Sequence, residues 1–220
     1  VAAPVVDSIG RLVGQITVDD VMDEVREQSE RDYQLASGLS QDVETDDSVF
    51  RQTTARLPWL LIGMIGGIGN SMILGNFDST FAAHPEMALY IPLIGGTGGN
   101  VGTQSSALVV QGLANSSLDA HNTWKQIVKE SVVAVINATI ISMLVYIYNF
   151  IRFGATATVS YSVSVSLFAV VMFASIFGTL VPMTLEKLKI DPAIATGPFI
   201  SITNDIIGMM LYMGITVLLS

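Results

Sequence analysis

Asp205 is the residue of this sequence best suited to binding a cation, because it lies inside a long apolar segment between Ile202 and Gly208. A carboxylate at the centre of a membrane helix costs about 2.5–3.5 kcal/mol to insert, so such residues usually face a polar cavity. Small and polar residues recur around it at helical spacing, namely Gly197, Ser201, Asp205, Gly208 and Tyr212. This face predicts an ion pathway or, alternatively, a stripe of tight helix packing.

A glycine-rich run, Gly95-Gly96-Thr97-Gly98-Gly99-Asn100-Val101-Gly102, is the second candidate. Each glycine costs about 1 kcal/mol in a helix relative to alanine, so helix propensity does not explain the run. Irregular backbone lining a membrane cavity would turn carbonyls, such as those of Gly98 and Gly99, toward a hydrated ion. Close packing between helices is the alternative. A phosphate-binding loop is excluded, because no Gly-Lys-Ser/Thr follows.

Further carboxylates have a structural and a functional interpretation. Asp191 precedes Pro192, a pair typical of a helix N-cap followed by an N1 proline. On one continuous helix it would lie about 21 Å before Asp205 and add negative charge at a pore mouth. An N-terminal acidic group is either a solvated helix face or a weak divalent-cation site; its members are Asp19, Asp20, Asp23, Glu24, Glu27, Glu30 and Asp32.

Several classes of chemistry are excluded by residue type and spacing. The sequence has no cysteine, which removes disulfides and thiolate metal sites. His84 and His121 stand alone, without the spacing of a zinc centre, and we expect both in links. Walker and nucleophile-elbow motifs are absent as well. No span contains His-Glu-x-x-His or a comparable catalytic pair, so we predict that this chain is neither an ATP-driven pump nor an intramembrane enzyme.

The composition indicates a lipid environment for the segments that carry these residues. Half of the 220 residues are hydrophobic, only 13% are charged, and the net charge is −9. The mean hydropathy is +0.57, too apolar for an ordinary water-exposed surface. The net negative charge lies in the first 50 residues, which hold twelve Asp and Glu against three Arg. Such a segment repels nucleic acid and attracts cations.

Five apolar stretches after Arg56 reach the roughly 20 residues that a helix needs to cross a bilayer. We therefore predict an all-α polytopic membrane protein with five transmembrane helices at Leu57–Leu74, Met87–Leu113, Val132–Phe150, Val163–Leu185 and Ala193–Leu219. A cytoplasmic N-terminal part places every Lys and Arg after residue 50 inside except Arg152, in agreement with the positive-inside rule.

The first 55 residues have a different pattern. Two short apolar runs, Ala3–Val6 and Arg11–Val18, flank turn residues and predict a hairpin. Thr17 with Asp20 predicts a capped helix that reaches Gln28, and the acidic segment from Ser29 to Asp47 predicts a connecting helix and linker on the water side. The opening residues read like the interior of a strand, so we expect the chain to begin within a larger protein.

Taken together, four motifs resemble the MgtE family of Mg²⁺ channels. They are Ala55–Leu60, Pro92–Ser106, Asp191–Phe199 and the Asp205 motif, and Val5–Val21 resembles the end of the second CBS domain that precedes the membrane part in that family. The resemblance covers essentially the whole chain. It implies a CBS remnant over residues 1–28, a connecting (plug) helix and linker over 29–55, and a five-helix pore domain over 56–220.

The resemblance also implies a homodimer in the inner (plasma) membrane, with a Mg²⁺ pore on its two-fold axis lined by the second and fifth helices. Asp205 would be the pore carboxylate, and Asn100, Thr103, Gln104 and Asn204 would bind the hydrated ion through water. Cytoplasmic Mg²⁺ would close the pore through acidic positions matched by Asp19, Asp20, Asp23 and Asp191. Transport of Co²⁺ or Mn²⁺, or cation exchange, remains the alternative, because hard-ligand sites discriminate by ion size and hydration.

Overall fold

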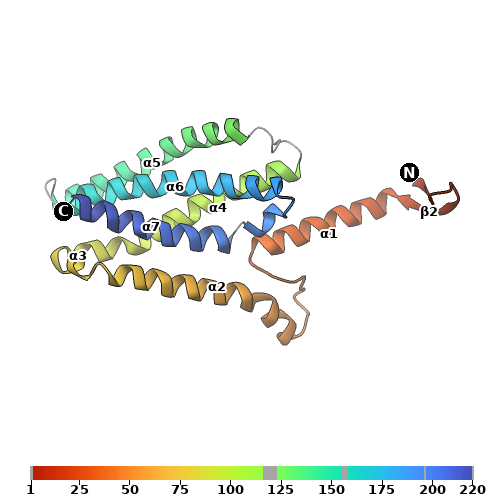
Figure 1. The fold of residues 1–220 in the computed structure, drawn as a ribbon, viewed down its shortest axis with the longest axis horizontal. Helices are drawn as coiled ribbons and strands as arrows, with labels where there is room; N and C mark the ends of the chain where they lie inside the picture. The colour runs from red at the N-terminus through yellow and green to blue at the C-terminus, as the bar shows by residue number, and fades with distance from the viewer. Residues whose placement is uncertain (1, 116–122, 155–157, 196, 220) are drawn as a thin grey trace.

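A computed structural model of the chain describes residues 2–115, 123–154, 158–195 and 197–219; His121 lies outside the described residues. Figure 1 shows a bundle of long helices with a single helix and a hairpin projecting from one end. The strands are β1 (Ala2–Val6) and β2 (Leu12–Thr17). The helical elements are α1 (Val18–Ala36), α2 (Val49–Gly75), α3 (Asp78–Ala83), η1 (Pro85–Tyr90), α4 (Ile91–Ala114), α5 (Thr123–Phe153), α6 (Thr158–Lys187), η3 (Pro192–Ala195) and α7 (Pro198–Leu219).

The predicted N-terminal hairpin is confirmed. β1 and β2 pair antiparallel, with Ala2 opposite Thr17. The Asp7 carboxylate accepts hydrogen bonds from the backbone N–H groups of Ile9, at 3.0 Å, and Arg11, at 2.8 Å. An aspartate that accepts hydrogen bonds from the backbone just after it fixes a turn. Asp7, which lies between the two apolar runs, therefore stabilises the hairpin turn.

The helix after the hairpin begins as predicted but is longer. Thr17 caps α1 and forms a capping box with Asp20. α1 then continues to Ala36 without a break at residue 28, so the expected division between residues 28 and 29 falls inside one helix. No Gly or Pro interrupts this segment. Pairs one turn apart bridge the expected junction, from Arg26 to Glu30 and from Gln28 to Asp32, and favour continuation.

The capping box makes the start of α1 sensitive to acid. Hydrogen bonds from the Thr17 backbone N–H and then from its hydroxyl lower the pKa of Asp20. The stabilisation by Asp20 is present above the ordinary pKa of an aspartate and is lost as the pH falls through the lowered pKa. We expect hydrogen exchange in the first turn of α1 to speed up over that window. Thr17→Ala should cost about 1 kcal/mol there at neutral pH and weaken the pH dependence; an unchanged pH profile would contradict the assignment.

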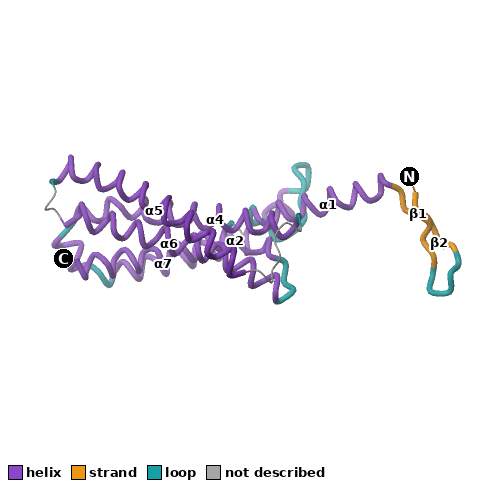
Figure 2. Tube along the Cα trace, turned by 90° about the horizontal axis from the view of Figure 1, so that it is seen from above, coloured by secondary structure: helices purple, strands orange, loops and turns teal. Residues whose placement is uncertain are grey.

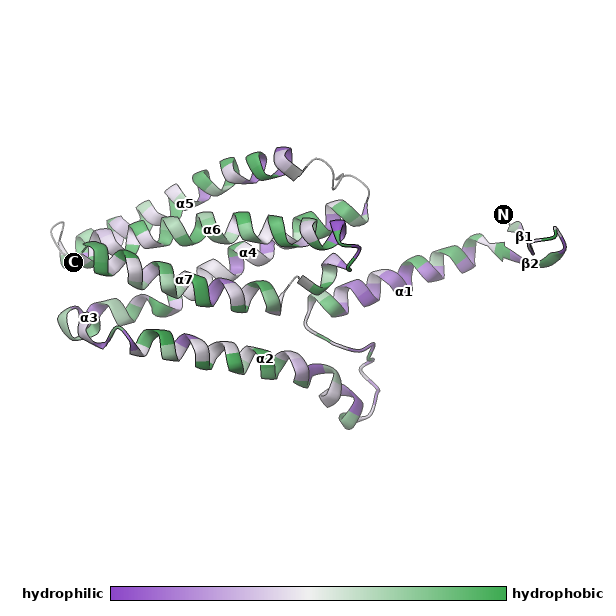
Figure 3. Ribbon diagram, in the orientation of Figure 1, coloured by the Kyte–Doolittle hydropathy of each residue, from purple (hydrophilic) through white to green (hydrophobic). Residues whose placement is uncertain are grey.

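Each predicted span corresponds to a long helix in the bundle. Among the residues that the structure describes, four helical stretches are long and apolar enough to cross a membrane: Val49–Gly75, Trp124–Phe153, Thr158–Lys187 and Pro198–Leu219. α4, which covers most of the second predicted span, has 24 residues and about 36 Å of length. Its Gly, Ser, Thr, Asn and Gln make it more polar, so its crossing stays a prediction. Figure 3 shows the contrast between the apolar bundle and hydrophilic α1.

α6 is the centre of the bundle. It packs against α4, α5 and α7, and its residues Val163, Leu167 and Val170 form a buried core with Ile94 of α4 and Tyr212 of α7. Figure 2 shows these helices running side by side along the long axis. α2 is more separate and contacts α7. The core therefore lies where α4, α6 and α7 meet, around the candidate residues.

The glycine run of α4 is regular helix, so the expected irregular backbone is wrong and close packing is observed. α4 is unbroken from Ile91 to Ala114. A Cβ at Gly102 would lie 1.9 Å from Asn204 Nδ2 of α7, and one at Gly178 of α6 would lie 2.4 Å from the Gly102 carbonyl oxygen. The glycines let three helices approach one another at backbone distance.

The expected single helix from Ala193 to Leu219 is also wrong. The short helix η3 ends at Ala195, and α7 begins at Pro198. Gly197 has a φ of +61°, a left-handed conformation that ends a helix readily in glycine. Pro198 is suited to the first turn of the new helix. Asp191 therefore lies just before η3 and Asp205 lies on α7, so the two carboxylates do not share one helix face 21 Å apart.

Candidate functional site

Asp205 lies on α7 where that helix faces the glycine surface of α4. A Cβ built at Gly95 would be 3.3 Å from Asp205 Oδ1, and one at Gly99 would be 3.6 Å from the same oxygen. Gly95 and Gly99 are one helical turn apart and buried. Because glycine has no side chain, Gly95 and Gly99 leave the space that the Asp205 carboxylate occupies. The two candidates from the sequence, Asp205 and the glycine run, thus form one site.

The Asp205 carboxylate has no hydrogen bond or ion pair with any residue in the described part of the chain. Its side chain is half-buried rather than sealed. A carboxylate at membrane depth requires a compensating partner, which is a cation, water or a proton. The arrangement is therefore suited to binding a cation at the surface between α4 and α7.

Two hydroxyls lie one turn from Asp205 on the side toward α1. Thr103 Oγ1 of α4 and Ser201 Oγ of α7 are 3.3 Å apart, and either can donate. Ser201 also lies near the surface left open by Gly99. Thr103, one of the predicted neutral partners, therefore lies beside Ser201, one helical turn from Asp205. Hydroxyl oxygens at this position can contact the water shell of an ion bound at the carboxylate.

The other predicted neutral partners lie differently. Asn204 is 1% exposed and packs against Gly98 and Gly102; its amide oxygen and nitrogen have no hydrogen-bond partner among the described residues. Asn100 and Gln104 are exposed on another side of α4. No hydrogen bond joins either of them to Asp205 in the described ranges. Only Gly99 and Thr103 of the predicted α4 set thus lie near Asp205 within this chain.

The predicted cytoplasmic carboxylates are not brought together. Asp191 is exposed and accepts a hydrogen bond of 2.8 Å from the backbone N–H of Ala193, which supports its N-cap interpretation. Asp19, Asp20 and Asp23 lie at the opposite end of α1 from the bundle (Figure 1). Among the residues that the structure describes, no group of three or more His, Asp or Glu is arranged to hold a metal ion.

The prediction missed Glu130, a buried carboxylate of α5. It is 9% exposed and accepts a hydrogen bond of 2.7 Å from the Ser105 hydroxyl of α4 and another from Ser175 of α6. The expected third span began at Val132, two residues too late to include it. The amphipathic start of α5 was the signal, because the segment from Trp124 already has apolar residues at helical spacing.

Membrane-length helices packed around an unpartnered carboxylate define a multi-pass helical membrane protein with an acidic site inside its bundle. A family model described as "MgtE: Divalent cation transporter" matches residues 91–215, more than half of the chain. The chain belongs to the MgtE family of divalent cation transporters.

Curated relatives extend the likeness over nearly the whole chain. A protein named magnesium transporter MgtE from Bacillus subtilis is 33% identical over 214 residues, 97% of this chain and 47% of the relative. Proteins of the same name from Thermus thermophilus and Enterococcus faecalis are 32% and 28% identical, over 98% and 97% of this chain. The chain spans about half the length of the curated relatives it matches. These names denote transporters, in agreement with the prediction that the chain is not an enzyme.

Proposed function

We propose that this chain forms the membrane part of a Mg²⁺ channel or transporter, with Asp205 as the carboxylate of its ion path. The observation that carries the proposal is the unpartnered Asp205 carboxylate against Gly95 and Gly99. Mg²⁺ gives up water reluctantly and usually binds proteins through one or two carboxylates with several waters retained. A single carboxylate with room beside it, rather than a closed cage of ligands, suits such an ion.

A homodimer would supply the second half of this path. In the described part of its own chain, Asp205 belongs to no group of three or more His, Asp or Glu that could hold a metal ion, and a closed two-fold axis would bring two copies of it together. The exposed side of α4 that carries Asn100 and Gln104 is available for a partner subunit or for the water of the pore. We therefore place α4 and α7 at the dimer axis, with Gly98 and Gly99 allowing the close approach of the pore helices.

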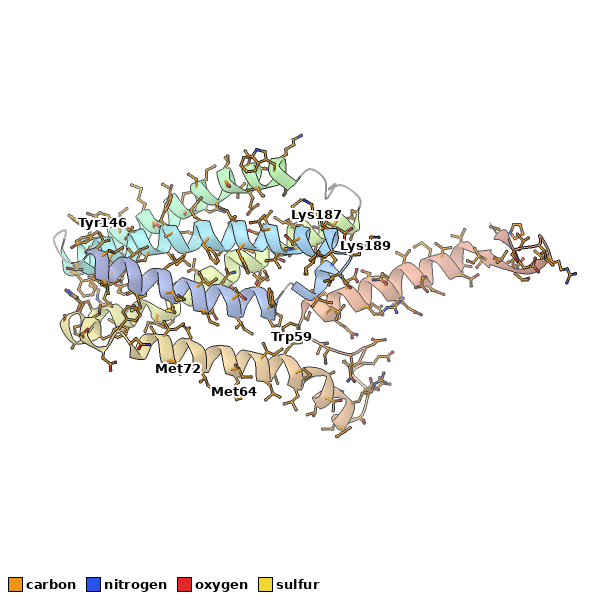
Figure 4. All side chains as sticks on the ribbon, viewed as in Figure 1. Trp59, Met64, Met72, Tyr146, Lys187 and Lys189 are labelled. Atoms are coloured by element: carbon orange, nitrogen blue, oxygen red, sulfur yellow. The ribbon has the colours of Figure 1, made fainter. Side chains whose placement is uncertain are left out.

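The N-terminal part would lie in the cytoplasm and the bundle in the inner (plasma) membrane. Figure 4 shows Lys187 and Lys189 at the end of the bundle nearest α1, and Tyr146 at the opposite end. Trp59 lies on α2 near the same end as the two lysines. Basic residues at one end and aromatic residues near the ends of spans are typical of a cytoplasmic face and its membrane boundary.

Close packing between the C-terminal end of α1 and the residues around the start of α7 supports gating by the cytoplasmic part. The last turn of α1 reaches the start of α7, where a Cβ at Gly197 would lie 2.2 Å from the Ala36 carbonyl oxygen. Likewise, a Cβ at Gly38 would lie 2.6 Å from Pro198 Cγ. A shift of α1 would be transmitted to α7 two turns before Asp205. Mg²⁺ bound near Asp19, Asp20, Asp23 or Asp191, with ligands from residues outside this chain or from a partner, would act through this junction.

Gly197→Ala is expected to loosen the junction between α1 and α7. Alanine at a left-handed φ costs about 1–2 kcal/mol, and the new methyl group would clash with Ala36. We expect hydrogen exchange over residues 30–38 to rise about 5- to 30-fold. Gly10→Ala is the matched control, because Gly10 has a φ of +82° with nothing within 4 Å. Equal exchange in the two variants at residues 30–38 would contradict a packed junction.

Flux into proteoliposomes loaded with a Mg²⁺ indicator tests the proposed function. We expect external Mg²⁺ to enter vesicles containing the chain faster than protein-free vesicles. Parallel assays with Co²⁺ and Mn²⁺ address the alternative substrates. Entry of Co²⁺ or Mn²⁺ without entry of Mg²⁺ would replace the proposal by transport of another divalent ion, and no entry of any of them by the folded dimer would overturn it.

A further inference from the structure

A polar cavity lies within one subunit, between α4, α5 and α6. Its volume is about 480 Å³. It is lined by polar side chains at the α1 end of the bundle, including Gln104, Gln111, Asn115, Gln126, Glu130 and Asn137. Asp205, Ser201 and Gly99 do not line it. This cavity is therefore separate from the surface between α4 and α7.

Glu130 is held in the wall of this cavity by neighbouring helices. Both serine hydroxyls, from Ser105 and Ser175, donate to the same oxygen, Oε1. Ser105 and Ser175 are themselves 3.1 Å apart. Hydrogen bonds to a charged acceptor are the stronger class, so this pair of donors stabilises the carboxylate anion and fixes its orientation. The three helices thus present a preorganised carboxylate to the cavity.

The charge of Glu130 is not balanced by the protein. Among the described residues, no Lys, Arg or His lies within ion-pair distance of it. Lys129 lines the same cavity but is exposed and outside that distance. A buried carboxylate without a counter-ion is costly. A mobile cation in the cavity would supply the missing charge.

We propose that the cavity beside Glu130 binds a hydrated divalent cation, at a site distinct from Asp205. The six waters of a hydrated ion occupy about 180 Å³ at about 30 Å³ each, so the cavity has room for the ion with its shell. One carboxylate with amide oxygens from Gln111 and Asn137 provides the hard oxygen atoms that such a hydrated ion prefers. The site would bind the ion outside the dimer axis and couple its occupancy to the spacing of α4, α5 and α6.

Mn²⁺ and a nitroxide spin label test this site in the full chain. Because the chain has no cysteine, Val132→Cys gives a single labelling position; Val132 is 56% exposed and does not line the cavity. We expect saturable broadening of its spectrum by Mn²⁺. Met72→Cys on α2 provides a distant label, at which the broadening should be weak.

Three substitutions on the labelled chain test whether Glu130 is the side chain that binds Mn²⁺. Glu130→Gln keeps an acceptor for both serines and removes the charge, so Mn²⁺ affinity at label 132 should fall at least tenfold. Lys129→Gln removes a competing charge and should raise the affinity. Glu86→Gln, in η1 and outside the cavity, should leave the Mn²⁺ affinity at label 132 unchanged. If Glu130→Gln is not recovered as a folded dimer, Glu130→Asp takes its place and should weaken binding while retaining saturation.

The outcomes separate this site from the ion path. Asp205→Asn should leave broadening at label 132 unchanged even where it stops flux. The inference would be overturned if Mn²⁺ did not broaden the spectrum of label 132 in the chain without further substitutions, or if the broadening were equal after Glu130→Gln. If the broadening at label 132 were lost in Asp205→Asn but kept in Glu130→Gln, the Mn²⁺ ion detected would be bound at Asp205. That result would overturn the site at Glu130 and leave the proposed function intact.

Discussion

Asp205→Asn is expected to reduce Mg²⁺ influx into proteoliposomes at least about tenfold. The substitution keeps the size and shape of the side chain next to Gly95 and Gly99 and removes the negative charge. A tenfold loss corresponds to about 1.4 kcal/mol of lost stabilisation of the ion in its path. That is a modest demand on a charge-assisted interaction with a divalent ion's water shell, so the measured loss should be at least this large.

The control for this experiment is a neutralised carboxylate that lies outside the bundle core. Asp78 opens α3 and is exposed, so Asp78→Asn makes the same chemical change without touching α4 or α7. It should conduct like the unsubstituted chain. Size-exclusion profiles of both variants establish that the folded state is retained. Normal influx through folded Asp205→Asn protein would remove Asp205 from the ion path.

Local chemistry made the N-terminal elements predictable from sequence. Asp7 in the turn and Thr17 with Asp20 at the cap each act on their own neighbouring backbone. Interactions of this kind depend on residues two to four positions apart, so the sequence contains nearly all the information that specifies them. The same holds for the long apolar helices, because bilayer thickness sets their length.

The contacts within the site depend on tertiary packing and were less accessible. The glycine run predicted close approach of something to α4, but Asn204 of α7 and Gly178 of α6 are the partners only because of how the helices cross. The break at Gly197 was missed because Pro192 offered an earlier helix start. Glu130 was missed because the start of the third span was chosen by hydropathy alone. The amphipathic residues before Val132, which include Glu130, also belong to α5.

Asp205 and Glu130, two carboxylates that pack between helices of the bundle, show why residue type does not determine role. Asp205 lies beside glycines and has no donor in the described part of its chain, so under the proposed function its charge would be available to a passing ion. Glu130 accepts two serine hydroxyls and faces a cavity inside one subunit. The first environment favours weak, exchangeable binding and the second favours a fixed site. Transport requires the first, because an ion that binds too tightly does not leave.

Gly178→Ala is expected to destabilise the bundle strongly, because Gly178 of α6 lies against the backbone of α4. The new Cβ would lie 2.4 Å from the backbone oxygen of Gly102 and 3.1 Å from its Cα. A flexible side chain could move away, but a helix backbone moves only if α4 and α6 separate. Overpacking of a well-packed core costs about 1–3 kcal/mol and occasionally more. We expect a cost of about 3 kcal/mol at this position, measured as a lower melting temperature by fluorescence-detected size exclusion.

Gly96→Ala on α4 is the matched control, because a Cβ at this position would have nothing within 4 Å of it. Alanine has the higher helix propensity by about 1 kcal/mol, so this variant should melt at the same temperature or higher. The comparison separates the loss of a glycine from the loss of close packing. If Gly178→Ala and Gly96→Ala have the same melting temperature, then α4 and α6 are not in backbone contact. The space around Asn204 and Asp205 would then be set by another pair of helices.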